Sequence, residues 1–222
     1  LSTVKTVNGK KPVFFGLDAK NDFYAKNIKN SGDGKISATL CFDNNNIDVE
    51  IPAIGTYMVT NALAAAAAGK LLGLTDEEIA NGVASYKTVG SRANVINTGK
   101  IKIIDDCYNA NPTSVRASLD TLSNLDGRKV AILGDMKELG SEELKLHFDT
   151  GVYAKSKGIG TVITVGELAK ELAKGADGKA FDTIEDAKPE ILKTIKSGDV
   201  VLVKASHSMQ FENIVEFLKQ NF

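Results

Sequence analysis

Residues 101–113 read I-K-I-I-D-D-C-Y-N-A-N-P-T, and this stretch decides the fold class. Its β-branched residues predict a buried strand over Ile101–Asp105, and a helical pattern follows over Thr113–Leu125. Between the two lie a carboxylate, a thiol, a phenol and two amides within a few positions. Such a polar cluster is typical of a strand end that faces a ligand.

After residue 98 the chain alternates strictly between strands and helices. Further strands are predicted at 129–133, 161–165, 179–181 and 200–203, and further helices at 141–157, 168–174, 184–196 and 209–219. Continuously apolar runs such as V-V-L-V (200–203) are typical of parallel strands that are buried on both faces. The sequence therefore predicts an α/β domain over residues 99–222, with ligands beyond the carboxyl ends of a mostly parallel sheet.

Residues 1–98 have a mixed pattern, so we place a domain boundary near residue 98. Two alternating segments, Ile36–Phe42 and Ile47–Ile51, predict a hairpin with a four-residue turn over 43–46. An alanine-rich helix is expected from Asn61 to Gly73. The next helix should begin at Thr75, with Glu78 as its capping-box partner.

The composition excludes several classes of function. The chain has 27 basic and 28 acidic residues and a formal net charge of −1, which argues against nucleic acid or an anionic membrane as partner. The apolar run at 62–69 is too short to span a bilayer, and no signal peptide is recognisable. Cys41 and Cys107 form no C-x-x-C motif, so we expect a cytoplasmic protein without a disulfide.

The common nucleotide and metal motifs are missing from the sequence. No G-x-G-x-x-G follows a strand, and no Gly-Lys pair is followed by Ser or Thr. His147 and His207 have no second His or Cys at metal-ligand spacing, so we predict no metal site formed by this chain. His147, within a helix, is more simply structural, whereas His207 follows a strand end where both a structural and a functional role are open.

Several polar residues have two open interpretations. Asp105 and Asp106 point to opposite sides of a strand, so they cannot both face one ligand. One of them either caps the next helix or faces solvent, or it accepts hydrogen bonds from a ribose. Arg92 is either a solvated surface residue or a fork for phosphate or a purine edge. Asn61 is either a simple N-cap or a recognition residue.

Five stretches occur in the order known from one enzyme family: G-T-Y-M-V-T-N-A-L-A-A (55–65), G-S-R (90–92), I-D-D-C-Y-N-A-N-P (104–112), A-I-L-G-D-M-K-E-L-G (131–140) and V-L-V-K-A-S-H-S-M (201–209). The chain resembles the C-terminal part of a Mur ligase of the MurF type. The resemblance implies that residues 1–98 are the last part of an α/β central ATPase domain and that 99–222 are the Rossmann-like C-terminal domain. It also implies that the P-loop lies upstream and that the chain alone is inactive.

The resemblance implies an ATP- and Mg²⁺-dependent amide ligase that joins D-alanyl-D-alanine to UDP-N-acetylmuramoyl-tripeptide through an acyl phosphate. We expect a monomer, with most magnesium ligands outside this chain. By position, Asn61 matches the residue that contacts adenine, Arg92 a residue that meets the nucleotide, and Asp106 the residue that binds the ribose. No catalytic residue is assigned here, and the residues that match substrate-binding positions are Tyr108, Asn109, Asn111, Lys204, Ser206 and His207.

Several positions depart from the family pattern, among them Ala93, where a larger residue is common, and Ala205, where the family usually has Gly. Tyr57 and Met58 stand where the family often has His-Asn, and His207 stands where an Arg is usual. Histidine lacks the permanent charge and the bidentate fork of arginine, so the acceptor could differ. Two alternatives therefore stay open: another Mur-like amide ligase, of the MurE or folylpolyglutamate type, and a non-catalytic α/β nucleotide-binding module.

Overall fold

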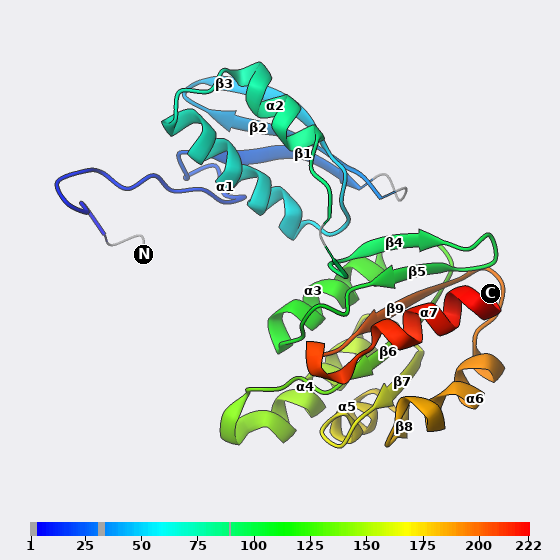
Figure 1. Cartoon of the computed structure of the whole chain (residues 1–222). Coiled ribbons are helices and arrows are strands. Elements are labelled where there is room, and N and C mark those ends of the chain that lie inside the picture. Colours follow the sequence, from blue (N-terminus) through cyan, green and yellow to red (C-terminus); the bar gives the residue numbers. More distant parts are fainter. Residues whose placement is uncertain (1–3, 31–33, 89) are drawn as a thin grey trace. The chain divides into compact units, whose positions relative to one another are not determined.

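The computed structural model describes residues 4–30, 34–88 and 90–222, which form two compact units divided between Lys87 and Thr88 (Figure 1). This division lies before the boundary predicted near residue 98. The difference arises because a strand that the sequence did not predict, β4 (Asn94–Asn97), pairs antiparallel with β5 (Lys102–Asp105) and so belongs to the second unit.

The first unit contains a three-stranded antiparallel sheet and two helices. The strands β1 (Tyr24–Asn30), β2 (Ile36–Phe42) and β3 (Asn45–Ile51) lie in sequence order, followed by α1 (Tyr57–Leu71) and α2 (Asp76–Ala84). Alternate residues of β2 join apolar residues of both helices in one core: Ile36, Ala38, Leu40, Phe42, Val59, Leu63, Ile79 and Val83. The predicted hairpin is thus confirmed.

The hairpin turn is tighter than the predicted four residues. Phe42 pairs directly with Asn45, so only Asp43 and Asn44 form the loop, with φ angles of +47° and +61°. Two successive left-handed residues are typical of a type I′ turn, which Asp and Asn tolerate better than other residues with a side chain. The prediction was wrong because it counted all four polar residues as loop.

The two helix starts in this unit turned out differently. Helix α1 begins at Tyr57, so Asn61 lies one turn inside the helix and the N-cap interpretation of Asn61 is wrong. The prediction placed the helix start at the alanine run and therefore missed the first turn, which begins at Tyr57. At α2 the capping box is confirmed: the Glu78 amide donates to Thr75 Oγ1 at 3.2 Å, and the Thr75 amide donates to Glu78 Oε2 at 2.8 Å.

The second unit contains a six-stranded sheet in the order β4-β5-β9-β6-β7-β8. Only β4 runs antiparallel, which confirms the predicted α/β class with a mostly parallel sheet. The other strands are β6 (Arg128–Gly134), β7 (Thr161–Val165), β8 (Lys179–Phe181) and β9 (Asp199–Lys204). The helices are α3 (Pro112–Ser123), α4 (Glu143–Ser156), α5 (Ala169–Ala176), α6 (Ile184–Thr194) and α7 (Glu212–Asn221), with short 3-10 turns η1 (Gly140–Glu142) and η2 (His207–Met209).

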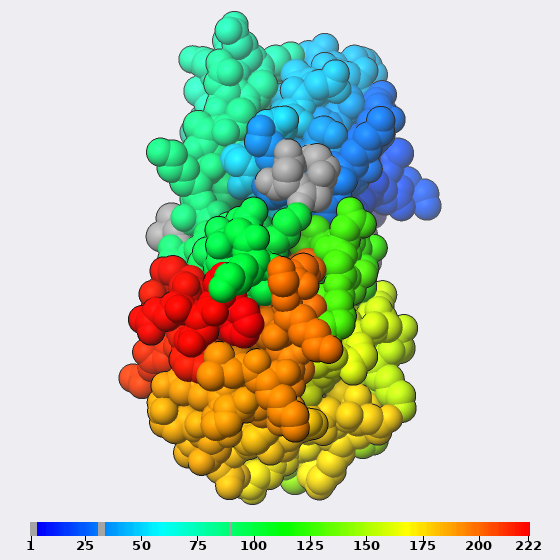
Figure 2. Space-filling model, turned by 90° about the vertical axis from the view of Figure 1, so that its right-hand side faces the viewer, coloured from blue at the N-terminus to red at the C-terminus, as the bar shows by residue number. Residues whose placement is uncertain are grey.

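Helices cover both faces of this sheet. On one face, α6 and α7 pack on alternate strand residues in a core that includes Ile103, Ile132, Val201, Phe211 and Leu218. In Figure 2 this unit is seen from the edge of the sheet, with α7 in red and the segment between α6 and β9 in orange at the surface. On the other face, α3 contacts β6 and β9, α5 contacts β7, and α4 packs against both of these helices.

The register brings three strand ends together. Asp105 of β5 pairs with Val203 of β9, and Lys204 of β9 pairs with Leu133 of β6. The polar residues that follow these strands therefore meet at one edge of the sheet, as the carboxyl ends of parallel strands do. Among the described residues, no helix is long and apolar enough to cross a membrane.

Candidate functional site

A pocket of about 540 Å³, lined mostly by residues with polar side chains, lies at the carboxyl ends of β5, β6 and β9. Its wall comes from three segments that are distant in sequence: residues 108–111, 137–139 and 206–208. Five of the six predicted substrate-binding residues line it, namely Tyr108, Asn109, Asn111, Ser206 and His207. The structure thus brings these predicted residues together, although their roles stay predictions.

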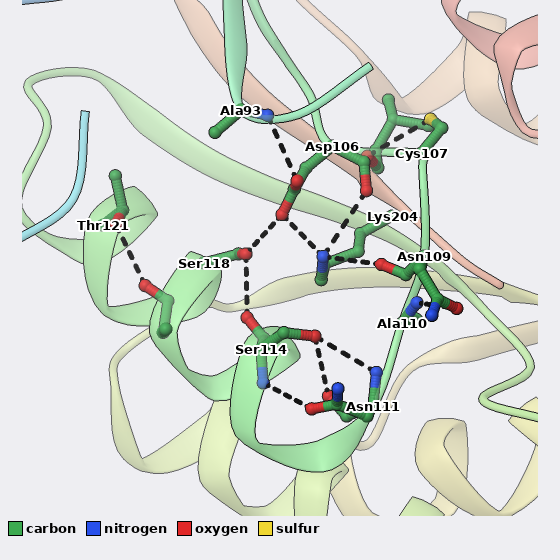
Figure 3. A network of polar contacts seen from close by, with 12 residues as sticks. Ala93, Asp106, Cys107, Asn109, Ala110, Asn111, Ser114, Ser118, Thr121 and Lys204 are labelled. Carbon is green, nitrogen blue, oxygen red and sulfur yellow. Dashed lines mark hydrogen bonds and ion pairs between the residues drawn. The ribbon is translucent and has the colours of Figure 1, made fainter. Parts of the chain in front are cut away.

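The sixth residue, Lys204, is not at the pocket surface. Its side chain is only 3% exposed, and its Nζ donates to Asp106 Oδ2 at 2.6 Å and to the Asn109 carbonyl at 2.9 Å (Figure 3). A buried cation that is already paired has little capacity left for a substrate. Lys204 therefore lies beneath the pocket and not on its wall, and its predicted substrate-binding role stays a prediction.

Asp106 is held from several sides. Its Oδ2 also accepts a hydrogen bond from Ser118 Oγ at 2.7 Å, and its Oδ1 accepts one from the Ala93 amide at 3.1 Å. The residue is 8% exposed. A carboxylate offers about four acceptor positions, and partners among the described residues occupy three of them, which leaves capacity on Oδ1. The predicted ribose contact stays a prediction.

Tyr108 and His207 of the pocket wall are neighbours, and Arg92 packs on Tyr108. The Arg92 guanidinium is 3.5 Å from the centroid of the Tyr108 ring, and this ring is 5.9 Å from the His207 ring. Tyr108 is 46% exposed, so this group of side chains is open to a ligand. A guanidinium this close to an aromatic face is held by a cation–π interaction and keeps its planar donors available.

The two asparagines of the motif have local structural roles. Asn111 is the N-cap of α3: its Oδ1 accepts from the Ser114 amide at 2.9 Å, and Ser114 Oγ accepts from the Asn111 amide at 3.1 Å. Pro112 follows as the first helical residue, where its missing amide costs nothing. Asn109 Oδ1 accepts from the Ala110 amide at 2.8 Å. Both side chains therefore shape the strand-to-helix turn as well as line the pocket.

Lys137 lines the same pocket and was missed at the sequence level. Its Nζ lies 2.7 Å from Oδ2 of the buried Asp135, whose Oδ1 accepts from the Ala169 amide at 2.8 Å. Ser206 Oγ accepts from the Lys137 amide at 2.9 Å, which ties the ends of β6 and β9 together. The signal that could have identified Lys137 is the stretch G-D-M-K (134–137), which follows the predicted strand at 129–133 and contains two charged residues.

Two other polar residues have structural positions. His147 is fully buried; its Nε2 accepts from the Met136 amide at 2.9 Å and its Nδ1 lies 2.7 Å from the Glu143 carbonyl oxygen, so the structural interpretation holds. Burial raises the pKa of the Cys107 thiol far above its usual value, and the charge of Asp105 raises it further. A thiol in that state is no nucleophile at neutral pH.

Asn61 lies in the first unit, on the wall of a separate, mostly apolar pocket of about 320 Å³ between α1 and α2. Its Nδ2 is 3.5 Å from the Met58 sulfur, a weak acceptor, so its amide is open to a stronger partner. Within the described ranges, no group of three or more His, Cys, Asp or Glu side chains is arranged to hold a metal ion.

Comparisons with known proteins decide the family. Residues 91–207 match the family described as "Mur ligase, glutamate ligase domain", and residues 2–69 match the Mur ligase middle domain. The chain belongs to the Mur ligase family. The predicted resemblance is thereby confirmed, and the pocket of this Mur ligase chain lies mainly within the matched 91–207 region.

Two curated relatives are named UDP-N-acetylmuramoyl-tripeptide–D-alanyl-D-alanine ligase. That of Bacillus subtilis is 34% identical over 92% of this chain and 46% of its own length; that of Escherichia coli is 33% identical over 98% and 49%. The chain therefore spans about half the length of the curated relatives it matches.

Among solved structures, MurF from Acinetobacter baumannii superimposes with a TM-score of 0.87 at 30% identity, covering 94% of this chain and 46% of that one. MurF from Thermotoga maritima in complex with ADP gives a TM-score of 0.83 at 27% identity, covering 94% and 48%.

Proposed function

We propose that this Mur ligase chain is part of an ATP-dependent ligase that joins D-alanyl-D-alanine to UDP-N-acetylmuramoyl-tripeptide, a step of peptidoglycan synthesis. The names of its relatives support this proposal. The observation that carries it is the pocket at the strand ends, where residues 108–111, 137–139 and 206–208, from three of the stretches that carry the family resemblance, line one wall.

The pocket suits the accepting dipeptide, which carries a terminal carboxylate. Lys137 is the one Lys or Arg among the lining residues, and its side chain is 44% exposed although Asp135 holds its Nζ. A fixed, partly exposed ammonium can pair with a carboxylate at modest entropic cost. Hydrogen-bond donors and acceptors of Asn109 and Ser208 complete a polar wall for the peptide unit.

For ATP we propose contacts with residues that do not line this pocket. We propose that Arg92 and Asn61 contact ATP, since the Arg92 fork and the Asn61 amide both have open donors. We propose that the magnesium ligands come mostly from elsewhere in the enzyme, and no step is assigned to Mg²⁺ here. We further propose that the ligase acts as a monomer in the cytoplasm, where ATP is available.

The test uses the ligase that contains this chain and measures initial rates against each substrate. Lys137→Gln should raise KM for D-alanyl-D-alanine by about tenfold, the usual effect of losing one charge-assisted bond, and leave KM for ATP unchanged. Lys145→Gln is the matched control, because Lys145 pairs with Asp149 on the exposed surface of α4. With the dipeptide carboxamide as acceptor, the wild type and Lys137→Gln should perform equally. An equal loss with both acceptors would remove the carboxylate role.

A panel of acceptor amines decides between this ligase and its sister types. Preference for a single amino acid or for glutamate over the dipeptide would assign the chain to a MurE or folylpolyglutamate type. The in-frame coding sequence upstream of Leu1 decides the second alternative: a G-K-[ST] motif there would exclude a non-catalytic module.

A further inference from the structure

The segment Ser91–Asn94 has a strained conformation at its centre. Ala93 has φ +55°, in the left-handed region that a residue with a Cβ rarely adopts. Such a conformation persists only where the surroundings hold it, and it is often found beside functional residues. Here the neighbour is Arg92, the exposed cation of the candidate site.

Three contacts hold this segment against the end of β5. The Ala93 amide donates to Asp106 Oδ1 at 3.1 Å, and the Tyr108 amide donates to the Ser91 carbonyl at 2.9 Å. Between these two backbone bonds, the Arg92 guanidinium packs on the Tyr108 ring at 3.5 Å. The position of the Arg92 side chain therefore depends on two contacts: the hydrogen bond from the Ala93 amide to the Asp106 carboxylate, and the packing of Arg92 on Tyr108.

The Asp106 carboxylate is itself immobilised from beneath. Figure 3 shows Lys204 and Ser118 converging on it, at 2.6 Å and 2.7 Å from the same oxygen, which leaves the other oxygen directed at Ala93. Ser118 Oγ also lies 2.9 Å from the Ser114 carbonyl oxygen, and the two acceptors share its one hydrogen. Because Lys204 also binds the Asn109 carbonyl, α3, β9 and the turn after β5 all contribute to one orientation of the carboxylate.

We infer that Lys204, Ser118 and Asp106 form a clamp that holds Ala93 in its left-handed conformation and so positions Arg92 for its ligand. Asp106 is then a positioning residue, and its carboxylate serves the backbone of this segment before it serves any ribose. The clamp follows from the geometry alone; its consequence for nucleotide binding rests on the proposed function.

Amide hydrogen exchange in this 222-residue chain tests the clamp directly. Asp106→Asn should lower the protection of the Ala93 and Tyr108 amides by about tenfold or more, since a local opening becomes easier. Ser118→Ala, which leaves the Lys204–Asp106 pair intact, should lower the protection of the same two amides and leave that of the β7 amides unchanged. In Asp106→Asn the loss of protection at Ala93 and Tyr108 should exceed the loss at the β7 amides, which follows the stability of the whole unit. If Asp106→Asn does not fold, Ser118→Ala decides the question.

Asp105→Asn is the matched control for this measurement. Asp105 is the adjacent aspartate and is equally buried; its carboxylate accepts a long bond of 3.4 Å from the Cys107 amide and interacts with the Cys107 thiol. Unchanged Ala93 protection in Asp106→Asn or in Ser118→Ala, or an equal loss in Asp105→Asn, would overturn the clamp.

Nucleotide binding to the whole ligase separates positioning from direct ribose contact. If Asp106 acts through Arg92, Asp106→Asn should lower the affinities for ATP and for 2′,3′-dideoxy-ATP by the same factor. Adding Arg92→Ala to this variant should then lower either affinity little further. If Asp106 instead holds the ribose hydroxyls, Asp106→Asn should lower the affinity for ATP but not that for 2′,3′-dideoxy-ATP, so that the two nucleotides bind equally well. That result would overturn the positioning role. Failure of every form to bind nucleotide would contradict the proposed function, while the exchange result would still stand.

Discussion

Nζ of Lys204 lies 2.6 Å from Oδ2 of Asp106, although the two residues are 98 positions apart and both side chains are almost fully buried. The pair joins the ends of β9 and β5, the two strands that meet beneath the candidate site. Opposite charges in such a position stabilise a fold only while both are present, because either one alone would be buried without a partner.

We therefore expect Lys204→Met to destabilise the second unit by about 3–5 kcal/mol. Urea unfolding followed by circular dichroism measures the change. The same substitution in an Asp106→Asn background should cost clearly less, since no charge is then left unpaired. An equal cost in both backgrounds would show that Lys204 acts through packing of its alkyl chain.

The crossing of α4 and α5 depends on two glycines. A Cβ at Gly151 would lie 2.0 Å from the Leu172 carbonyl oxygen, and one at Gly175 would lie 2.2 Å from that of Phe148. Since backbone cannot move aside as a side chain can, each Gly→Ala change should destabilise the unit by about 1–3 kcal/mol or more. Gly160→Ala is the control: its Cβ meets nothing within 4 Å, and its φ is not in the left-handed region. Thermal melts of the three variants should separate the control from the two others.

Thr164 in β7 is fully buried, and its hydroxyl has no hydrogen-bond partner among the described residues. Thr164→Val, nearly the same in shape, should therefore stabilise the protein by about 1–2 kcal/mol. Thr150→Val should do the opposite, because the equally buried Thr150 hydroxyl donates to the Leu146 carbonyl at 2.7 Å. A loss of stability in Thr164→Val, measured by chemical unfolding, would indicate an ordered water on that hydroxyl.

The capping box of α2 makes a pH-dependent contribution to stability. The Thr75 amide, and then its hydroxyl, hold the pKa of Glu78 below its usual 4.5. A lowered pKa means that the contribution is complete above the unfolded value and is lost as the pH falls through the folded value. Glu78→Gln should remove this dependence while keeping an acceptor for the same bonds. The test is the free energy of unfolding measured from about pH 6 down to about pH 3, the range in which carboxylates titrate. The control is Glu77→Gln, which lies in the same turn but outside the capping box.

The sequence by itself determined the class of the fold and most of its elements. Periodicity and β-branched composition are local properties, so β7 and β8 were predicted with the bounds the structure shows, and the Thr75–Glu78 capping box was legible from its spacing. The motif at 104–112 likewise pointed to the strand end where the pocket lies.

Only the tertiary structure decided what the polar residues of that strand end do. Strand β9, late in the chain, is inserted between β5 and β6, and no local pattern encodes this order. The insertion buries Lys204 against Asp106, directs the carboxylate to Ala93 and leaves Lys137 at the pocket surface. Which charge is paired and which remains available for a ligand depends on distances between segments that are far apart in sequence, and folding alone sets those distances.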